Sequence, residues 1–313
     1  MPRYRIEHET RYEYAAPVSE SWQMARLAPR ELPWQRLLSH RLLIDPLPDE
    51  SETRSDSFGN EVTRFALHRA HELLRVHMTC MVEVLERPDG PHAPAVDAPG
   101  APPPVLQVGS DGEPWETVRD RLRPPAPPHD LQVAQAREAS SQLPWSGEAF
   151  AYAAQSLQAG RDWFAAVTEL MRRIHRDFEF EPGATTVSTP VAAVLAKRKG
   201  VCQDFAHLMI SCLRSHGLPA MYASGYLLTE PPPGKPRLAG ADASHAWVRA
   251  WSARHGWVEF DPTNDTLADE RYVVLGWGGD FADVAPLRGV ILGGGEQQLE
   301  VEVSVWPLPD EAT

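Results

Sequence analysis

A proline-dense stretch in the first half of the chain limits how the 313 residues can fold. Between Pro88 and Pro128 lie 12 of the 30 prolines. Proline has no amide hydrogen and a fixed φ, so such a stretch cannot continue a helix or the central strand of a sheet. We therefore expect a domain at residues 1–87, an extended connection at 88–130 that a short helix around 115–121 interrupts, and a second domain at 131–313.

The first domain has the sequence pattern of a half-buried β-sheet. From Arg3 to Tyr14, aromatic, apolar and small polar residues alternate with charged residues, which is typical of a strand with one buried face. Further strands are expected at residues 21–27, 40–44, 62–67 and 74–84. We expect a β-rich, sandwich-like domain without any evident chemistry of its own.

The second domain mixes helices and strands. After Asp162, a candidate N-cap, apolar residues recur at helical spacing as far as residue 174. Pro190 begins another expected helix, which runs toward the basic residues 197–199. A strand is expected at 220–228, and the alternating residues 299–305 form a last strand that fits either sheet.

A cysteine lies where a third helix of this domain begins. Phe205, Leu208, Met209 and Cys212 recur at the spacing of a core-facing helix that starts close to Cys202. The unpaired amides and the dipole at that end favour a thiolate. Most free cysteines are buried apolar residues, however, so Cys202 alone does not identify a nucleophile.

Two later segments supply a base and a carboxylate. Residues 242–251 alternate, and residues 257–262 follow after a turn-like stretch, which predicts a hairpin. If Trp251 pairs with Trp257, His245 and Asp261 become diagonal neighbours on one face, roughly 7–8 Å apart at the backbone. Together with Cys202 they have the residue types of a nucleophile, base and orienting carboxylate.

Four motifs occur in a fixed order between residues 189 and 264. They are G-V-C-Q-D-F-A-H-L, G-L-P-A-M-Y-A-S-G-Y, S-H-A-W-V and G-W-V-E-F-D-P-T-N. In this order they resemble the bacterial transglutaminase-like superfamily. Residues before 87 are similar, more loosely, to the N-terminal region that accompanies many of these proteins.

The resemblance implies roles for individual residues. Cys202 would be the nucleophile, His245 the base and Asp261 the third member of the triad, and Tyr226 would line the site. The fold implied is α+β, with the β-rich domain followed by a papain-like, transglutaminase-like cysteine-hydrolase core. Gly279 stands where the family usually has arginine.

Other polar residues near Cys202 have more than one interpretation. Gln203, or the backbone amide of Cys202, is a candidate donor to a developing oxyanion. Trp247 is a candidate substrate contact, although tryptophans on hairpins more often pack in the core. We interpret Asp204 and His207 as structural. The soft and hard side chains of the triad lack the paired spacing of a metal site, so we expect neither a metal nor another cofactor.

The net charge and the cysteine content indicate which partners and which cell compartment to expect. A net charge of −13 argues against nucleic acid or an anionic membrane as a partner. There is no apolar run near 18 residues and no signal-peptide core, so we expect a cytoplasmic protein. Three scattered cysteines are too few for a disulfide framework, and a reducing compartment would keep Cys202 usable.

These observations predict cysteine-dependent acyl-enzyme chemistry on a protein or peptide substrate. Water as the acceptor would give a peptidase or amidase acting on peptide or isopeptide bonds, which we favour slightly because water is abundant in any open groove. An amine acceptor would give a protein-glutamine transglutaminase. A non-catalytic peptide-binding module is the rival class, and the sequence does not reveal the oligomeric state.

Overall fold

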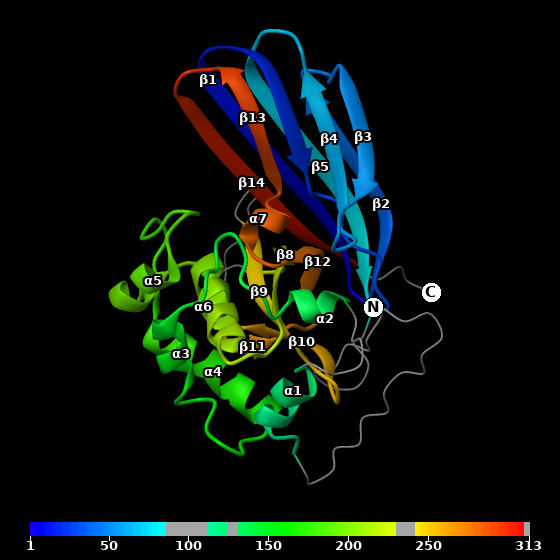
Figure 1. The fold of residues 1–313 in the computed structure, drawn as a ribbon. Coiled ribbons are helices and arrows are strands. Elements are labelled where there is room, and N and C mark those ends of the chain that lie inside the picture. Colours follow the sequence, from blue (N-terminus) through cyan, green and yellow to red (C-terminus); the bar gives the residue numbers. More distant parts are fainter. Residues whose placement is uncertain (86–111, 124–130, 230–241, 310–313) are drawn as a thin grey trace, which may run out of the picture.

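The computed structural model describes residues 1–85, 112–123, 131–229 and 242–309. It has the mixed α+β fold expected from the sequence (Figure 1). A curled, β-rich sheet stands over a second unit, in which helices pack against a smaller sheet.

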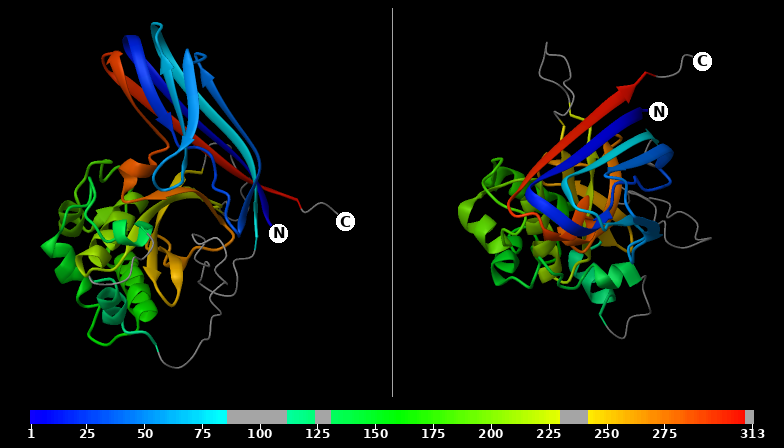
Figure 2. Two further views of the ribbon diagram at one scale, coloured as in Figure 1. Left: turned by 45° about the vertical axis from the view of Figure 1, so that its right-hand side comes forward. Right: turned by 90° about the horizontal axis from the view of Figure 1, so that it is seen from above.

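The curled sheet has seven strands, and all of them derive from the two ends of the chain. They are β1 (Arg3–Ala25), β2 (Gln35–Asp45), β3 (Glu50–Ser55), β4 (Glu61–Leu67), β5 (His71–Val84), β13 (Leu287–Gly293) and β14 (Gln297–Leu308). The first half of β1 pairs with β5 and β14, and its second half pairs with β4 and β13. One strand thus serves two sets of neighbours, and β14 runs beside β1 (Figure 2). The buried faces enclose a core that includes Ile6, Phe65 and Val76.

The strand pattern of this sheet differs from the expectation in several places, one of which is β13, where no strand was predicted. The predicted strands at residues 3–14 and 21–27 are parts of the single strand β1, whose register with β5 shifts between Glu13 and Val18. Strand β3 was not predicted, because every residue in it is exposed and polar or charged, so no alternation marks it. The last strand, which fitted either sheet, pairs with β1 as β14.

The second unit is built on a five-stranded antiparallel sheet with the order β11-β10-β9-β8-β12. Its strands are β8 (Ala220–Leu227), β9 (Ser244–Ser252), β10 (Gly256–Asp261), β11 (Thr266–Leu267) and β12 (Tyr272–Gly278). The short strands β6 (Glu179–Phe180) and β7 (Lys199–Gly200) form a separate parallel pair. The helices are α1 (Trp115–Arg121), α2 (Leu131–Gln135), α3 (Gly147–Ala153), α4 (Trp163–Asp177), α5 (Val191–Lys197), α6 (Cys202–Ser215) and α7 (Phe281–Val284).

Alternate residues of the sheet belong to two different cores. On one face Ala220, Val248 and Phe260 pack with residues of α4 and α6. On the other, Trp247 and Tyr272 pack with α2 and with Phe58 of the N-terminal part. Because successive residues of a strand point to opposite faces, the helices α4 and α6 pack on one face of this sheet and α2 packs on the other.

The expected helix within the connection is present as α1. Trp115 and Val118 bury their side chains in the same core as α4 and α6, so this helix packs on the second unit. The rest of the proline-rich connection, at 88–111 and 124–130, lies outside the described residues. Among the helices that the structure describes, none is both long and apolar enough to cross a bilayer.

Candidate active site

Cys202 is the first residue of helix α6, as its sequence pattern predicts. The carboxylate of Asp204 holds this end in place, since its Oδ2 accepts hydrogen bonds from the Val201 amide at 2.8 Å and from Thr185 Oγ1 at 2.6 Å. A side chain at Gly200 would lie 2.8 Å from Asp204, so the approach of the chain to the helix needs glycine there. The Cys202 thiol remains partly exposed, whereas those of Cys80 and Cys212 are buried.

His245 and Asp261 meet across the hairpin of β9 and β10. Trp251 pairs with Trp257, which confirms the predicted register. The His245 Nε2 atom lies 2.7 Å from Asp261 Oδ2, and the Asp261 side chain is fully buried. Cys202 is the other group that acts on His245, as a hydrogen-bond partner and as a charge that raises the pKa of the imidazole. The three side chains therefore lie in one group, in which the distance from His245 to Asp261 is that of a hydrogen bond.

The surroundings of His245 favour its protonated form. Burial lowers the pKa of the imidazole, but the hydrogen bonds and charges of Asp261 and Cys202 outweigh it and raise the pKa to about 10. When an imidazolium lies between a carboxylate and a cysteine sulfur, its positive charge favours the thiolate form of a cysteine.

Besides its contact with His245, the Asp261 carboxylate accepts four further hydrogen bonds. Oδ1 accepts the backbone amides of Thr263 at 2.8 Å and Asn264 at 3.2 Å. Oδ2 accepts the Asn264 side-chain amide and the Tyr272 hydroxyl, each at 2.7 Å. Burial would raise the pKa of this carboxyl group, but the hydrogen bonds from His245, Asn264 and Tyr272 lower it overall. The carboxylate is thus held ionised and in one orientation beside the imidazole.

Asn264 and Tyr272 were not among the predicted site residues. Asn264 could have been found, because an aspartate side chain often accepts amides two or three residues on, and such a turn brings Asn264 back to Asp261. Tyr272 had no such local signal, since it lies on a strand that the sequence pattern did not predict, and two strands, β9 and β8, lie between that strand and β10.

The structure corrects the expectation for Tyr226. Its strand pairs Gly225 with His245, so Tyr226 points to the opposite face. There its side chain is fully buried under the curled sheet, and its hydroxyl lies 2.8 Å from Nδ1 of His8. Tyr226 is therefore a residue of the junction between the two units and not of the site.

Trp247 packs beside the site without a surface for substrate. Its ring stacks on that of His245 with centroids 6.1 Å apart and meets Tyr272 edge to face. The side chain is fully buried, and its indole N–H donates to Glu259 Oε2 at 2.9 Å. This burial and the contact with Glu259 agree with the core-packing interpretation.

Gln203 and His207, the other candidates near Cys202, each form a hydrogen bond with the backbone of another segment. Gln203 Nε2 donates to the Val187 carbonyl at 3.1 Å, so this side chain braces the preceding loop. His207 is buried, and its Nε2 accepts the Phe281 amide at 3.2 Å, which agrees with a structural role.

Within residues 1–85, 112–123, 131–229 and 242–309, no group of three or more His, Cys, Asp or Glu side chains is arranged to hold a metal.

Two family models match the chain. Residues 4–83 match the bacterial transglutaminase-like N-terminal region, and residues 151–262 match the transglutaminase-like superfamily. The second match contains all three residues that the structure connects at the site.

Bacterial relatives are similar to the chain over its whole length or over part of it. An uncharacterized protein of Mycobacterium tuberculosis is 40% identical over 318 residues, covering 99% of this chain and 94% of its own length. An uncharacterized protein of Mycobacterium leprae is 31% identical, covering 97% and 99%. A protein-glutamine gamma-glutamyltransferase of Pseudomonas aeruginosa is 34% identical over 140 residues, which are 42% of this chain and 20% of that protein.

A solved structure shares the fold along the full length. It is that of a candidate cysteine protease from Cytophaga hutchinsonii, with a TM-score of 0.72 and 18% identity. The match covers 100% of this chain and 92% of the other. The arrangement of curled sheet and helix-bearing unit therefore occurs in at least one further protein.

Proposed function

The chain belongs to the transglutaminase-like superfamily, and from this premise we propose that it catalyses acyl transfer through Cys202, with His245 as base and Asp261 as orienting carboxylate. Members of this superfamily use cysteine-based catalysis. The observation that carries the proposal is the position of the His245 imidazole, which engages Cys202 on one side and Asp261 on the other.

In the proposed reaction the Cys202 thiolate attacks an amide carbonyl and forms a tetrahedral intermediate. The first turn of α6 and the backbone amide of Cys202 lie at the positive end of the helix, which suits the developing oxyanion. The carbon–nitrogen bond then breaks, and the His245 imidazolium gives its proton to the leaving amine. This leaves a thioester on Cys202 and a neutral imidazole.

The acceptor in the second step decides the class of enzyme. With water, neutral His245 takes a proton as the oxygen attacks the thioester, and the products are a carboxylate and the free thiolate. With a primary amine the same steps give a new amide. We propose hydrolysis of a peptide or isopeptide bond, because water is the more abundant acceptor. Transamidation is the second candidate, because a stretch of 140 residues, 42% of this chain, is 34% identical to the Pseudomonas glutamyltransferase.

The test separates the two products in one reaction. Glutamine-containing peptides are incubated with the wild-type protein, with and without a primary amine, and analysed by mass spectrometry. Hydrolysis predicts cleaved or deamidated peptide whose yield is unaffected by the amine, whereas transamidation predicts an amine adduct. Cys202→Ala should abolish both products and any thioester adduct while the protein stays folded. Full activity in that variant would overturn the proposal.

Alkylation by iodoacetamide tests the rival class, a module that binds peptide without turning it over. If His245 activates Cys202, this thiol should react rapidly at neutral pH, and His245→Ala should slow the reaction. Cys80 is the internal control, because burial raises its pKa to about 12. Peptide binding with a Cys202 that reacts no faster than an ordinary exposed thiol would favour the binding module.

We keep the cytoplasm as the proposed compartment. The three cysteines are free in the structure, and the chemistry requires that of Cys202 to stay reduced. Fractionation of cells that produce the protein at native level would test this proposal.

A further inference from the structure

Strand β12 forms one edge of the five-stranded sheet, and side chains of the N-terminal part pair with its backbone. Gln35 accepts the Val274 amide on Oε1 at 2.7 Å and donates from Nε2 to the Val274 carbonyl at 2.8 Å. Asn60 does the same with Trp277, at 3.0 and 2.8 Å. A primary amide carries a donor and an acceptor side by side as a peptide unit does, so Gln35 and Asn60 replace a neighbouring strand.

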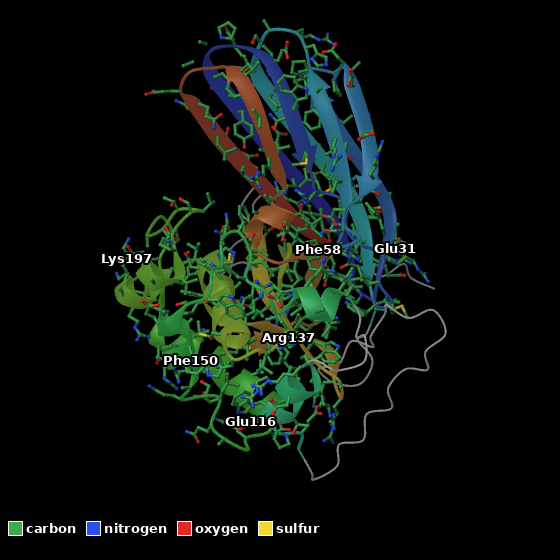
Figure 3. All side chains as sticks on the ribbon, viewed as in Figure 1. Glu31, Phe58, Glu116, Arg137, Phe150 and Lys197 are labelled. Atoms are coloured by element: carbon green, nitrogen blue, oxygen red, sulfur yellow. The ribbon has the colours of Figure 1, made fainter. Side chains whose placement is uncertain are left out.

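These two amides are themselves held in place. Gln35 and Asn60 are at most 1% exposed. Gln35 Nε2 also donates to the Arg30 carbonyl at 2.8 Å, and Arg30 Nη1 donates to Asn60 Oδ1 at 2.7 Å. A Cβ on Gly276 would lie 2.7 Å from Asn60 Oδ1, so the edge of β12 fits closely against this amide. In Figure 3, Phe58 marks this end of the curled sheet, next to the second unit.

Tyr272 lies on β12 between two of these contacts. On one side the Tyr4 hydroxyl donates to the Glu270 carbonyl at 3.1 Å, and on the other Gln35 holds Val274. The Tyr272 hydroxyl donates to Asp261 at 2.7 Å. A rigid aromatic side chain transmits a shift of its strand to its hydroxyl, so the position of β12 sets the position of this donor.

We propose that Tyr272 is a positioning residue for the Cys202–His245–Asp261 triad, and that the N-terminal domain sets its position by gripping β12 through Gln35 and Asn60. The inference rests on the proposed function for its kinetic consequence. It gives the N-terminal domain a part in catalysis, although none of its described residues is placed in the triad.

A double-mutant cycle tests whether Gln35 acts through Tyr272. Tyr272→Phe removes the donor to Asp261, and Gln35→Met keeps the volume but removes both hydrogen bonds to Val274. We expect kcat to fall about tenfold in Tyr272→Phe and about threefold in Gln35→Met, with KM nearly unchanged. The double variant should be no slower than Tyr272→Phe alone, because the two changes act on one contact.

An NMR measurement tests the role of Tyr272 without any substrate turnover. The proton between His245 Nε2 and Asp261 should give a downfield NMR resonance, and both single variants should move it upfield as that bond lengthens. The control is Val76→Ala, which weakens the N-terminal core eight residues along β5 from the partner of Gln35, roughly 26 Å away. This variant should leave the resonance and kcat unchanged. If Gln35→Met does not fold, Tyr4→Phe is the milder change at the same strand.

Three results would overturn the inference. They are an unchanged resonance in Tyr272→Phe, additive losses of kcat in the double variant, and an equal effect of Val76→Ala at equal loss of thermal stability. A wild-type protein without turnover would instead count against the proposed function, and the resonance would still decide the role of Tyr272.

Discussion

Asp261 is the residue on which the hydrogen bonds of the site converge. Two backbone amides, two side chains and the imidazole all donate to its carboxylate. A fully buried carboxylate is stable only with such partners, and here they also fix the direction in which it faces His245. The orientation of the base therefore depends together on a turn, on the edge strand β12 and on the hairpin.

Asp261→Asn should preserve the fold but greatly reduce turnover. The asparagine side chain has a similar shape, but its NH2 group opposes the Nε2–H of His245 and favours the wrong tautomer. We expect kcat to fall by roughly 10³- to 10⁴-fold, as for the equivalent change in other triads. Steady-state kinetics and circular dichroism would check this. Activity within tenfold of wild type would show that Asp261 does not orient the base.

At the scale of elements, strand β8 brings a glycine directly opposite the histidine. Gly225 pairs with His245, and a Cβ there would lie 1.9 Å from the Val273 carbonyl and 2.7 Å from the Trp247 ring. Strands β8, β9 and β12 can therefore approach each other around the base only if residue 225 has no side chain.

Gly225→Ala should destabilise the protein by about 2–3 kcal/mol, because the methyl group forces β8 away from β12. The control is Gly147→Ala at the start of α3, where nothing lies within 4 Å of the added Cβ. That change should stabilise by up to about 1 kcal/mol. Urea denaturation compares the two. Equal unfolding midpoints for Gly225→Ala and wild type would contradict the close approach.

The same elements show what could be predicted from the sequence. The helix at Cys202 and the hairpin register are encoded locally, in an apolar spacing and in alternation on both sides of one turn. The support of Asp261 by Tyr272, and of β12 by Gln35, joins residues up to 239 positions apart. No periodicity records such contacts. Tyr226 shows the limit of resemblance, since strand alternation turns it away from His245.

At the scale of the whole molecule, the two ends of the chain form one sheet. Arg3 pairs with Leu308, so the curled sheet is completed only after the second unit has been traversed. Residues 1–87 alone would lack β13 and β14, which pair with both halves of β1. The proline-rich connection therefore divides the sequence into a β-rich and a mixed pattern, but the curled sheet contains strands from both sides of it.

Buried histidines in both units should make the whole fold sensitive to acid. Burial, together with the charge of His77, lowers the pKa of His8 at the junction to about 4. Burial also lowers the pKa of His207 in α6 to about 4. Both are neutral in the folded protein, but in the unfolded chain they bind protons near pH 6.5. Their contribution to stability is complete above that pH and is lost as the pH falls from 6.5 to 4.

The free energy of unfolding should therefore fall by roughly 2 kcal/mol for each of these histidines between pH 6.5 and 5. The raised pKa of His245 acts above pH 6.5, and the lowered pKa of Asp261 acts below about 4, so neither offsets this loss. Urea denaturation at several pH values measures it. His207→Gln keeps an acceptor for the Phe281 amide and should remove part of the dependence. A free energy of unfolding that is constant from pH 7 to 5 would mean that water or a local opening reaches these rings, and that the two cores are less closed than their burial indicates.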